Sequence, residues 1–461
     1  MSIVERIAVL DIGKTNVKVV IIDAVSGMEI AAVRMANHVL AGPPYPHYDV
    51  EGIWSFVLDA LAQFALSPGY DAISIATHGA CAALLDSQGR LALPVLDYEH
   101  EYPQQVRDAY AAIRPNFAQT ASPFLPGGLN LGAQLHYQKA MFPADFARVA
   151  TIVTYPQYWA FRLTGVAANE ATSLGCHTDL WKPASADHSD LVAELGLSDV
   201  MAPVRSAFDR LGTLLPEIAQ RIGTTRPVSV FCGIHDSNAS LLPHLLRRDS
   251  PFAVVSTGTW VVSFAVGGNL AGLDPARDTL ANVDAFGRAV PSSRFMGGRE
   301  FELLTSGWPQ PADEDVAAAV DAMLATGRML LPAVVQGSGP FARHKAQFIG
   351  DEPRTAAEMH ALASIYIALM TETCLSLLDA RGDTIVEGPL AGNASYLRLL
   401  AGLTGRNVLA VSGSTGTGSG AALLAGVPPA PVAGRQIEPG AIAPVAALRR
   451  QWRQRLEMMP S

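Results

Sequence analysis

The sequence IAVLDIGKTNVKVVIID spans residues 7–23 and holds two short apolar runs on either side of a polar turn. The runs Ile7–Leu10 and Val17–Ile22 are rich in β-branched residues, which are typical of strands. Two such runs joined by a short polar connection predict a β-hairpin. The organisation of the rest of the chain follows from this hairpin.

The turn of the hairpin carries residue types that bind phosphate and metal. Asp11 ends the first strand, Gly13 can adopt a positive φ, and the N–H groups of the turn together with Thr15 can face an anion. A carboxylate beside a phosphate-binding turn indicates a divalent metal that bridges the two. An ordinary hairpin with a polar turn explains the same residues equally well.

The length and composition indicate a large globular protein. The 461 residues predict two or three domains. With 49% hydrophobic and 16% charged residues, the chain is not of the disordered class. The apolar runs are all shorter than the roughly 20 residues of a membrane span, and no basic leader precedes the first strand. We therefore expect a cytoplasmic protein that does not enter a membrane.

The net charge argues against a nucleic-acid-binding protein, and the cysteines argue against a zinc- or disulfide-containing protein. A net charge of −9 and the lack of a Lys/Arg cluster argue against nucleic acid as a partner. The cysteines lie far apart, have no CxxC spacing and sit among apolar or small residues, which favours buried reduced thiols over a zinc site or disulfides; they are Cys81, Cys176, Cys232 and Cys374. The expected ligand is a small molecule.

Polar residues follow the apolar strand predicted at Ala72–Ala76. His78 comes directly after this strand, where open α/β sheets bind ligands. A histidine satisfied by backbone in a turn explains the same position. The later loop PVLDYEHEY (residues 94–102) contains Asp97 and Tyr98, and it is either a solvated acidic loop or a set of carboxylates that bind sugar hydroxyls beside His78.

Asp236 lies just after another predicted strand, Val228–Cys232, in the sequence GIHDSNAS (residues 233–240). This position is also the predicted start of a helix, where an aspartate commonly serves as the N-cap. The residue is therefore either a structural cap or a carboxylate at the functional edge of the sheet.

The second half of the chain begins with a pattern like the first. Strands are predicted at Phe252–Ser256 and Trp260–Val266, and the turn between them is Thr257-Gly258-Thr259. This repetition indicates a duplicated architecture. A long amphipathic helix is predicted at Ala357–Leu378, and the loop EGPLAGN (residues 387–393) follows a short strand.

The glycine-rich sequence GSTGTGSG (residues 413–420) is not a P-loop, because no Lys follows the glycines in the required position. Its small residues allow close packing or a close approach to a nucleotide.

The order of these motifs is more specific than any one of them. Asp11 with Thr15, then GIHD, then STGTW, then EGPLAGN closely resembles the FGGY carbohydrate kinases of the actin/hexokinase/heat-shock ATPase superfamily. The resemblance covers nearly the whole chain. It implies an α/β fold with two ribonuclease-H-like domains that face a central cleft. Residues 1–243 would then bind mainly the sugar, and residues 244–461 mainly ATP.

The resemblance also assigns roles to individual residues. Asp236 matches the catalytic base, and it and Asp11 match the residues associated with Mg2+. The expected phosphate- or ATP-binding residues are Gly13, Lys14, Thr15, Thr257, Gly258, Thr259, Gly388 and Asn393. The expected substrate-binding residues are Asp236 and, from their positions after a strand and in the acidic loop, His78, Asp97 and Tyr98. The implied cofactors are ATP and Mg2+, and a homodimer is common among relatives.

The implied activity is ATP-dependent phosphorylation of a hydroxyl of a ketose or related polyol. Three departures from the common family pattern bear on the substrate: Thr77-His78-Gly79-Ala80 replaces Gly-Gln-Met-His, Lys14 stands where Thr is frequent, and Pro389 replaces a glycine. The sequences DIGKTN and EGPLAGN place the chain nearer the fuculose and rhamnulose kinases.

The alternative is a catalytically inactive sensor that binds sugar or ATP on the same fold. The presence of both Asp11 and Asp236 argues against it, because a pure binding protein needs no proton acceptor. A Rossmann oxidoreductase is excluded, because its GxGxxG motif does not follow the first strand.

Overall fold

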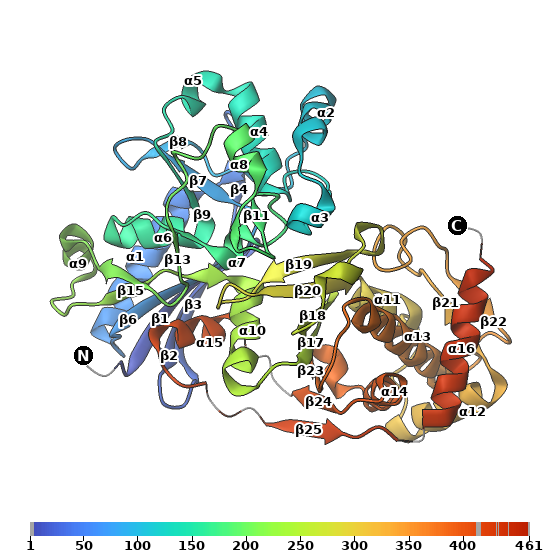
Figure 1. Cartoon of the computed structure of the whole chain (residues 1–461). Helices are drawn as coiled ribbons and strands as arrows, with labels where there is room; N and C mark the ends of the chain where they lie inside the picture. The colour runs from blue at the N-terminus through green and yellow to red at the C-terminus, as the bar shows by residue number, and fades with distance from the viewer. Residues whose placement is uncertain (1–3, 412–415, 430, 432, 441, 460–461) are drawn as a thin grey trace. The chain divides into compact units, whose positions relative to one another are not determined.

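The computed structural model describes residues 4–411, 416–429, 431, 433–440 and 442–459. The chain forms two compact α/β units, each built around its own sheet (Figure 1). The first unit comprises Met1–Arg247, Ala281–Ala289 and Thr415–Pro431, and the second comprises Arg248–Leu280, Val290–Ser414 and Val432–Ser461. Two later segments thus return to the first unit. The domain boundary between residues 243 and 244 stays a prediction.

The predicted N-terminal hairpin is confirmed. Strand β1 (Arg6–Ile12) pairs antiparallel with β2 (Asn16–Asp23), and Asp11 lies opposite Lys18. Side chains alternate between the two faces of a strand. Ala8 and Leu10 therefore belong to the core on one face of the sheet, whereas Ile7 and Val9 belong to the core on the other.

The first sheet has seven strands in the order β14-β15-β6-β1-β2-β3, and β16 also pairs with β6. The other strands of this sheet are β3 (Glu29–Ala36), β6 (Ala72–Thr77), β14 (Arg210–Thr213), β15 (Ser229–Phe231) and β16 (Ile234–His235). Strands β1 and β6 are parallel, so their carboxyl ends meet at one edge.

Helices cover both faces of this sheet. Helix α1 (Val50–Leu66) buries Trp54, Val57 and Leu61 against the core that contains Ala8 and Leu10. Helices α10 (Asp236–Arg247) and α15 (Thr417–Ala422) cover the opposite face. The other helices of the unit are α2 (Gln104–Ile113), α3 (Phe117–Thr120), α4 (Leu131–Met141), α5 (Pro143–Phe146), α6 (Tyr155–Thr164), α7 (Ala171–Leu174), α8 (Asp190–Glu194) and α9 (Pro216–Ile222).

Helices α10 and α15 pack closely because of one glycine. A Cβ atom on Gly420 would lie 1.8 Å from the carbonyl oxygen of Ala239. The close packing predicted for the glycine-rich sequence 413–420 is therefore confirmed at Gly420. Residues 413–415 of that sequence lie outside the described residues.

Short strands complete the first unit. A three-stranded sheet has the order β8-β7-β9, and the remaining strands form two-stranded sheets. These strands are β4 (Val39–Leu40), β5 (His47–Tyr48), β7 (Ala82–Leu85), β8 (Leu91–Leu93), β9 (Thr151–Thr154), β10 (Asn169–Glu170), β11 (Trp181–Lys182), β12 (Asp187–His188) and β13 (Val204–Arg205).

The sheet that contains β17 repeats the arrangement of the first, which confirms the duplicated architecture. Its order is β19-β20-β18-β17-β23-β24-β25, in which β17 and β18 form an antiparallel hairpin and β17 is parallel to β23. The strands are β17 (Phe252–Thr257), β18 (Val261–Val266), β19 (Thr279–Val283), β20 (Ala289–Phe295), β23 (Thr384–Glu387), β24 (Val408–Val411) and β25 (Gly434–Ile437). A separate pair consists of β21 (Met329–Leu331) and β22 (Gln347–Ile349).

The helices of the second unit pack around one buried helix, α13 (Ala356–Leu377). The others are α11 (Gly297–Thr305), α12 (Asp313–Thr326), α14 (Ala394–Thr404) and α16 (Ile442–Glu457). The helix predicted at Ala357–Leu378 is confirmed, but its predicted amphipathic character was wrong, because every residue from His360 to Leu375 is buried. Within the described part of the chain, α13 is the one helix long and apolar enough to cross a membrane. However, 89% of its apolar stretch is buried inside the structure.

Candidate active site

The carboxyl ends of three strands bring the candidate residues of the first unit together. In the register of the sheet, Asp11 of β1 lies beside Ala76 of β6, and Ala76 lies beside Ile234 of β16. His78 follows β6 directly, and Asp236 follows β16 directly. Asp11, His78 and Asp236 therefore share one edge of the sheet, which is where open α/β sheets place ligands.

Asp11 and Asp236 interact electrostatically. Burial, and then repulsion by Asp236, raises the pKa of Asp11 to about 6, while Lys18 and Arg34 oppose the rise. Two carboxylates so placed repel each other unless a cation lies between them. This arrangement fits a divalent metal.

The tip of the first hairpin is fixed by Asn37, a residue that sequence reasoning missed. Its Nδ2 donates a hydrogen bond of 2.8 Å to the carbonyl oxygen of Gly13, and its backbone N–H donates one of 2.9 Å to that of Thr15. Within the turn, the Gly13 N–H donates to the carbonyl oxygen of Asn16 at 2.9 Å. Thr15 is exposed, so its hydroxyl is accessible.

Asp236 does not act as a simple N-cap. Its Oδ1 accepts a hydrogen bond of 2.6 Å from the N–H of Ser237, the next residue, whereas a capping side chain accepts from the second or third residue of the helix. The side chain is 31% exposed, so the carboxylate is accessible to a ligand.

His235 contacts Asp236 and is a second residue that sequence reasoning missed. Its Nε2 lies 3.2 Å from Asp236 Oδ1 and 3.7 Å from Cys176 Sγ. Although burial opposes it, the charges of Cys176 and Asp236 raise the pKa of His235 to about 9. Burial also disfavours the thiolate of Cys176, but His177 and His235 outweigh it and lower the pKa of Cys176 to about 5. His235 and Cys176 thus each favour the charged form of the other, beside Asp236.

The four cysteines, all within the described residues, are buried and free, as predicted from their spacing. The lowered pKa of the Cys176 thiol depends on the adjacent His177 and on His235, which lies 59 residues further along the chain, and the spacing of the cysteines contained no signal of His235.

His78 is a buried hydrogen-bond acceptor in the first unit. Burial lowers its pKa to about 4, so the ring is neutral at pH 7. Its Nδ1 lies 2.9 Å from the carbonyl oxygen of Gly79 and must therefore donate, which leaves Nε2 as an acceptor. Among the described residues, Nε2 has no partner. A ligand hydroxyl satisfies such an atom.

The predicted residues Asp97 and Tyr98 lie close to His78. The ring of His78 is 5.6 Å from that of Tyr98 and 5.0 Å from that of Tyr48. The hydroxyl of Tyr48 donates to Asp97 Oδ1 at 3.2 Å. The ammonium of Lys14 also pairs with Asp97 Oδ1. The structure thus brings together three of the four predicted substrate residues, His78, Asp97 and Tyr98, and it adds Tyr48 and Lys14 to them.

The second hairpin is held by close backbone contacts. The Thr257 hydroxyl donates to the carbonyl oxygen of Glu387 at 2.5 Å and accepts from the N–H of Leu390 at 3.1 Å. Gly388 has a φ of 83°, and a Cβ atom there would lie 2.0 Å from the carbonyl oxygen of Thr257. The predicted phosphate turn and the loop EGPLAGN are therefore adjacent, and Thr259 is exposed.

Asn393 lies at the start of a helix, and both the oxygen and the nitrogen of its side-chain amide form hydrogen bonds. Its Oδ1 accepts from the N–H of Tyr396 at 2.9 Å as the N-cap of α14, and its Nδ2 donates to Ser364 Oγ at 2.9 Å. A role in ATP binding stays a prediction for this residue.

The chain offers few ligands of its own for a metal. Among the described residues, no group of three or more His, Cys, Asp or Glu side chains could hold an ion. Mg2+ is typically bound through one or two carboxylates together with substrate phosphates and water. The pair Asp11 and Asp236 fits such a partial site.

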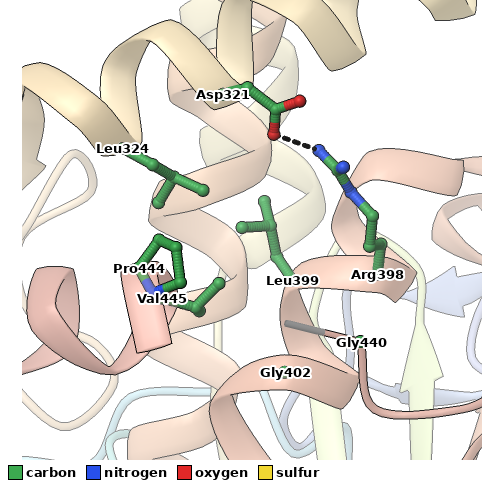
Figure 2. Close-up of a pocket in the computed structure, with 8 residues that line it drawn as sticks. All are labelled: Asp321, Leu324, Arg398, Leu399, Gly402, Gly440, Pro444 and Val445. Atoms are coloured by element: carbon green, nitrogen blue, oxygen red, sulfur yellow. Dashed lines mark hydrogen bonds and ion pairs between the residues drawn. The ribbon is translucent and has the colours of Figure 1, made fainter. Parts of the chain in front are cut away.

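The second unit also contains a cavity of about 120 Å³ between α12, α14 and α16 (Figure 2). An ion pair of 3.0 Å joins Asp321 to Arg398 on one side of it. Its lining consists of Asp321, Leu324, Arg398, Leu399, Gly402, Gly440, Pro444 and Val445. None of these is a predicted site residue, so the cavity is separate from the residues that the motifs identified.

Comparison with known proteins covers both halves of the chain. Residues 6–243 match the N-terminal domain of the FGGY family of carbohydrate kinases, and residues 249–433 match the C-terminal domain of carbohydrate kinase FGGY. The L-fuculokinase of Salmonella typhi is 27% identical over 270 residues, which are 56% of this chain and 55% of that relative. The alignment thus spans about half the length of the relative.

Solved structures match over nearly the full length. A carbohydrate kinase from Novosphingobium aromaticivorans is 36% identical, with a TM-score of 0.90 over 98% of both chains. A xylulose kinase from Lactobacillus acidophilus is 15% identical, with a TM-score of 0.80 over 98% of this chain and 97% of the other. The second likeness is one of fold alone.

Proposed function

We propose, because this chain belongs to the FGGY family of carbohydrate kinases, that it transfers the γ-phosphoryl group of ATP to a hydroxyl of a ketose or related sugar. The observation that carries the proposal is the position of Asp236, at the sheet edge that also holds Asp11 and His78. In this proposal residues 1–243 bind mainly the sugar, and residues 244–461 bind mainly ATP.

Asp236 acts as the general base. The sugar hydroxyl oxygen forms a bond to the γ-phosphorus while the bond from phosphorus to the bridging oxygen of ADP breaks, and the hydroxyl proton passes to Asp236. His235, at 3.2 Å from Oδ1, orients the carboxylate. The 31% exposure of the side chain supports this role, because the base must reach the ligand.

Asp11 is the residue that we propose to hold Mg2+, with Asp236 as the second carboxylate. When bound, Mg2+ neutralises charge on the phosphates. The raised pKa of Asp11, about 6, supports this role, because a carboxylate held in a repulsive and partly buried position gains from a cation.

The proposed substrate is a neutral ketose of the L-fuculose or L-rhamnulose type. The likeness to L-fuculokinase supports this choice at 27% identity. The unpartnered Nε2 of His78 supports a ligand that offers a hydroxyl donor.

The direct test measures ADP release with ATP, Mg2+ and a panel of L-fuculose, L-rhamnulose and D-xylulose. We expect at least one ketose to stimulate release, and Asp236→Asn to lower kcat by about 10²–10⁴-fold, the range for loss of general-base catalysis, while ATP still binds. Asp190→Asn, an exposed carboxylate paired with Lys182, is the matched control and should keep full activity. Full activity of Asp236→Asn would show that the base is misassigned. Binding of sugar and ATP without any transfer would favour the inactive sensor.

A further inference from the structure

Four residues, Tyr48, His78, Asp97 and Tyr98, lie close together in the first unit, and we call them the sugar-binding wall. The ammonium of Lys14 contacts three of them. It pairs with Asp97 Oδ1 and lies 3.3 Å from Glu99 Oε2. It also lies over two aromatic rings, at 4.7 Å from the centroid of Tyr98 and 5.2 Å from that of Tyr48. Carboxylates and the faces of aromatic rings are the partners that hold a cation in place. The side chain of Lys14 is therefore fixed toward this wall.

The charge around Lys14 is negative. One ammonium faces two carboxylates, Asp97 and Glu99, of which Asp97 is 8% exposed and Glu99 is 65% exposed. The three groups together carry a formal charge of −1, so the wall disfavours an anionic ligand. A neutral ligand with hydroxyl groups suits it better, because both donors and acceptors are present.

His78 provides an independent indication of a ligand at the same wall. Its ring contacts the rings of Tyr48 and Tyr98, the two that hold the Lys14 ammonium. Its Nε2 is buried and has no partner among the described residues. Three contacts to Asp97, from Lys14, Tyr48 and the N–H of Glu99, all go to Oδ1, which leaves Oδ2 as a further acceptor.

We propose that Lys14 is a specificity-determining residue for the sugar and not a phosphate contact. This inference rests on the proposed function. The Lys14 ammonium donates to one hydroxyl oxygen of a neutral polyol, Asp97 accepts from the adjacent hydroxyl, and His78 Nε2 accepts from a third. The site therefore selects an uncharged sugar with adjacent hydroxyls and rejects sugar acids.

The test is calorimetric titration without nucleotide, using L-fuculose, L-rhamnulose, D-xylulose and the sugar acid D-gluconate. We expect the wild type to bind at least one ketose and to bind D-gluconate at least about tenfold more weakly, a difference of about 1.4 kcal/mol. Lys14→Thr should weaken ketose binding by at least about tenfold, and its affinity for a non-hydrolysable ATP analogue should stay within about twofold.

Two further variants are the controls for this titration. Lys182→Thr makes the same change at a lysine paired with Asp190 elsewhere in the first unit, and it should bind as the wild type does. Lys14→Arg keeps the charge and the pairing with Asp97, so it should stay folded and bind the ketose with an intermediate affinity.

Three results would overturn the assignment of Lys14. They are a wild type that binds no ketose of the panel, a Lys14→Thr variant that binds ketose as the wild type does, and a variant that loses affinity for the ATP analogue instead. A wild type that binds a ketose but releases no ADP would contradict the proposed kinase activity alone, and the titration would still decide the role of Lys14.

Discussion

The two hairpins occupy equivalent places in the two sheets, yet their tips are held differently. In the first, Ile12 pairs with Val17, so residues 13–16 form the tip, and the side chain of Asn37 bonds to it. In the second, Thr257 pairs with Val261, so residues 258–260 form a shorter tip. There a Cβ atom on Gly298 would lie 1.8 Å from the carbonyl oxygen of Gly258.

This difference shows that one architecture uses two kinds of stabilisation. The first tip is surrounded by charged and polar side chains, and its properties therefore depend on electrostatics and hydrogen bonds. The second tip is held by backbone contacts too close for any side chain, and its properties therefore depend on glycine. We therefore expect mutations to affect the first tip through electrostatics and hydrogen bonds, and the second tip through steric clashes with the backbone.

The largest expected effect is steric and falls on the second hairpin, at the base of its tip. Gly388→Ala would bring a Cβ atom to 2.0 Å from the carbonyl oxygen of Thr257 at a φ of 83°. Because backbone must move, we expect a loss of more than about 4 kcal/mol in the free energy of unfolding, measured by denaturant titration.

The control for this prediction lies in the same loop. A Cβ atom on Gly392 would meet nothing within 4 Å, so Gly392→Ala should change the free energy of unfolding by less than about 1 kcal/mol. Equal effects of the two substitutions would show that close packing does not hold the second tip.

The next effect is electrostatic and falls on the first hairpin, next to its tip. Burial and Asp236 raise the pKa of Asp11 from 3.8 to about 6, so ionised Asp11 destabilises the folded state. This penalty is absent well below pH 4, grows as the pH rises from about 4 to about 6, and is complete above that range. At pH 8, without Mg2+ or nucleotide, Asp11→Asn should be more stable by up to about 3 kcal/mol, and this gain should shrink as the pH falls toward 4.

Asp23 at the other end of the same hairpin is the control. Hydrogen bonds from Ser26 lower its pKa, so its charge stabilises the folded state. Asp23→Asn should therefore give no gain at pH 8. If Asp11→Asn is less stable than the wild type at pH 8 and the difference does not vary with pH, the electrostatic account of the first tip is wrong.

The smallest effect concerns the hydrogen bond from Asn37. Asn37→Ala removes the bond of 2.8 Å to the carbonyl oxygen of Gly13, and we expect it to cost about 1 kcal/mol in thermal or denaturant unfolding. Asn16→Ala removes an exposed bond to Thr15 Oγ1 and should cost less than about 0.5 kcal/mol. If the two variants lose the same stability, Asn37 does not hold the tip.

Much of the fold could be predicted from local patterns. The strands predicted at Ala72–Ala76, Phe252–Ser256 and Trp260–Val266 agree with β6, β17 and β18 to within one residue at each end. Alternation and helical periodicity record which side of an element is buried, so they suffice where one face is solvated. They failed for α13, because a helix that is buried all round has no polar face to produce a period.

The candidate site was predictable in part. Motif order indicated Asp11 and Asp236, the end of a predicted strand indicated His78, and the sheet register places these three at one edge. Asn37 and His235 were missed, because their roles depend on partners reached only after the chain folds back. A hydrogen bond or an ion pair between distant residues leaves no periodic signal.

The sequence by itself determined the two hairpins, the order of the motifs and the family to which they belong, because these depend on residue types at short separations. Tertiary structure decided what surrounds each motif. Lys14 follows Asp11 in the same turn, yet its partners Asp97 and Glu99 lie more than 80 residues further along the chain. Its orientation toward Asp97 and Tyr98 is set by charge and aromatic contacts that exist only in the folded chain.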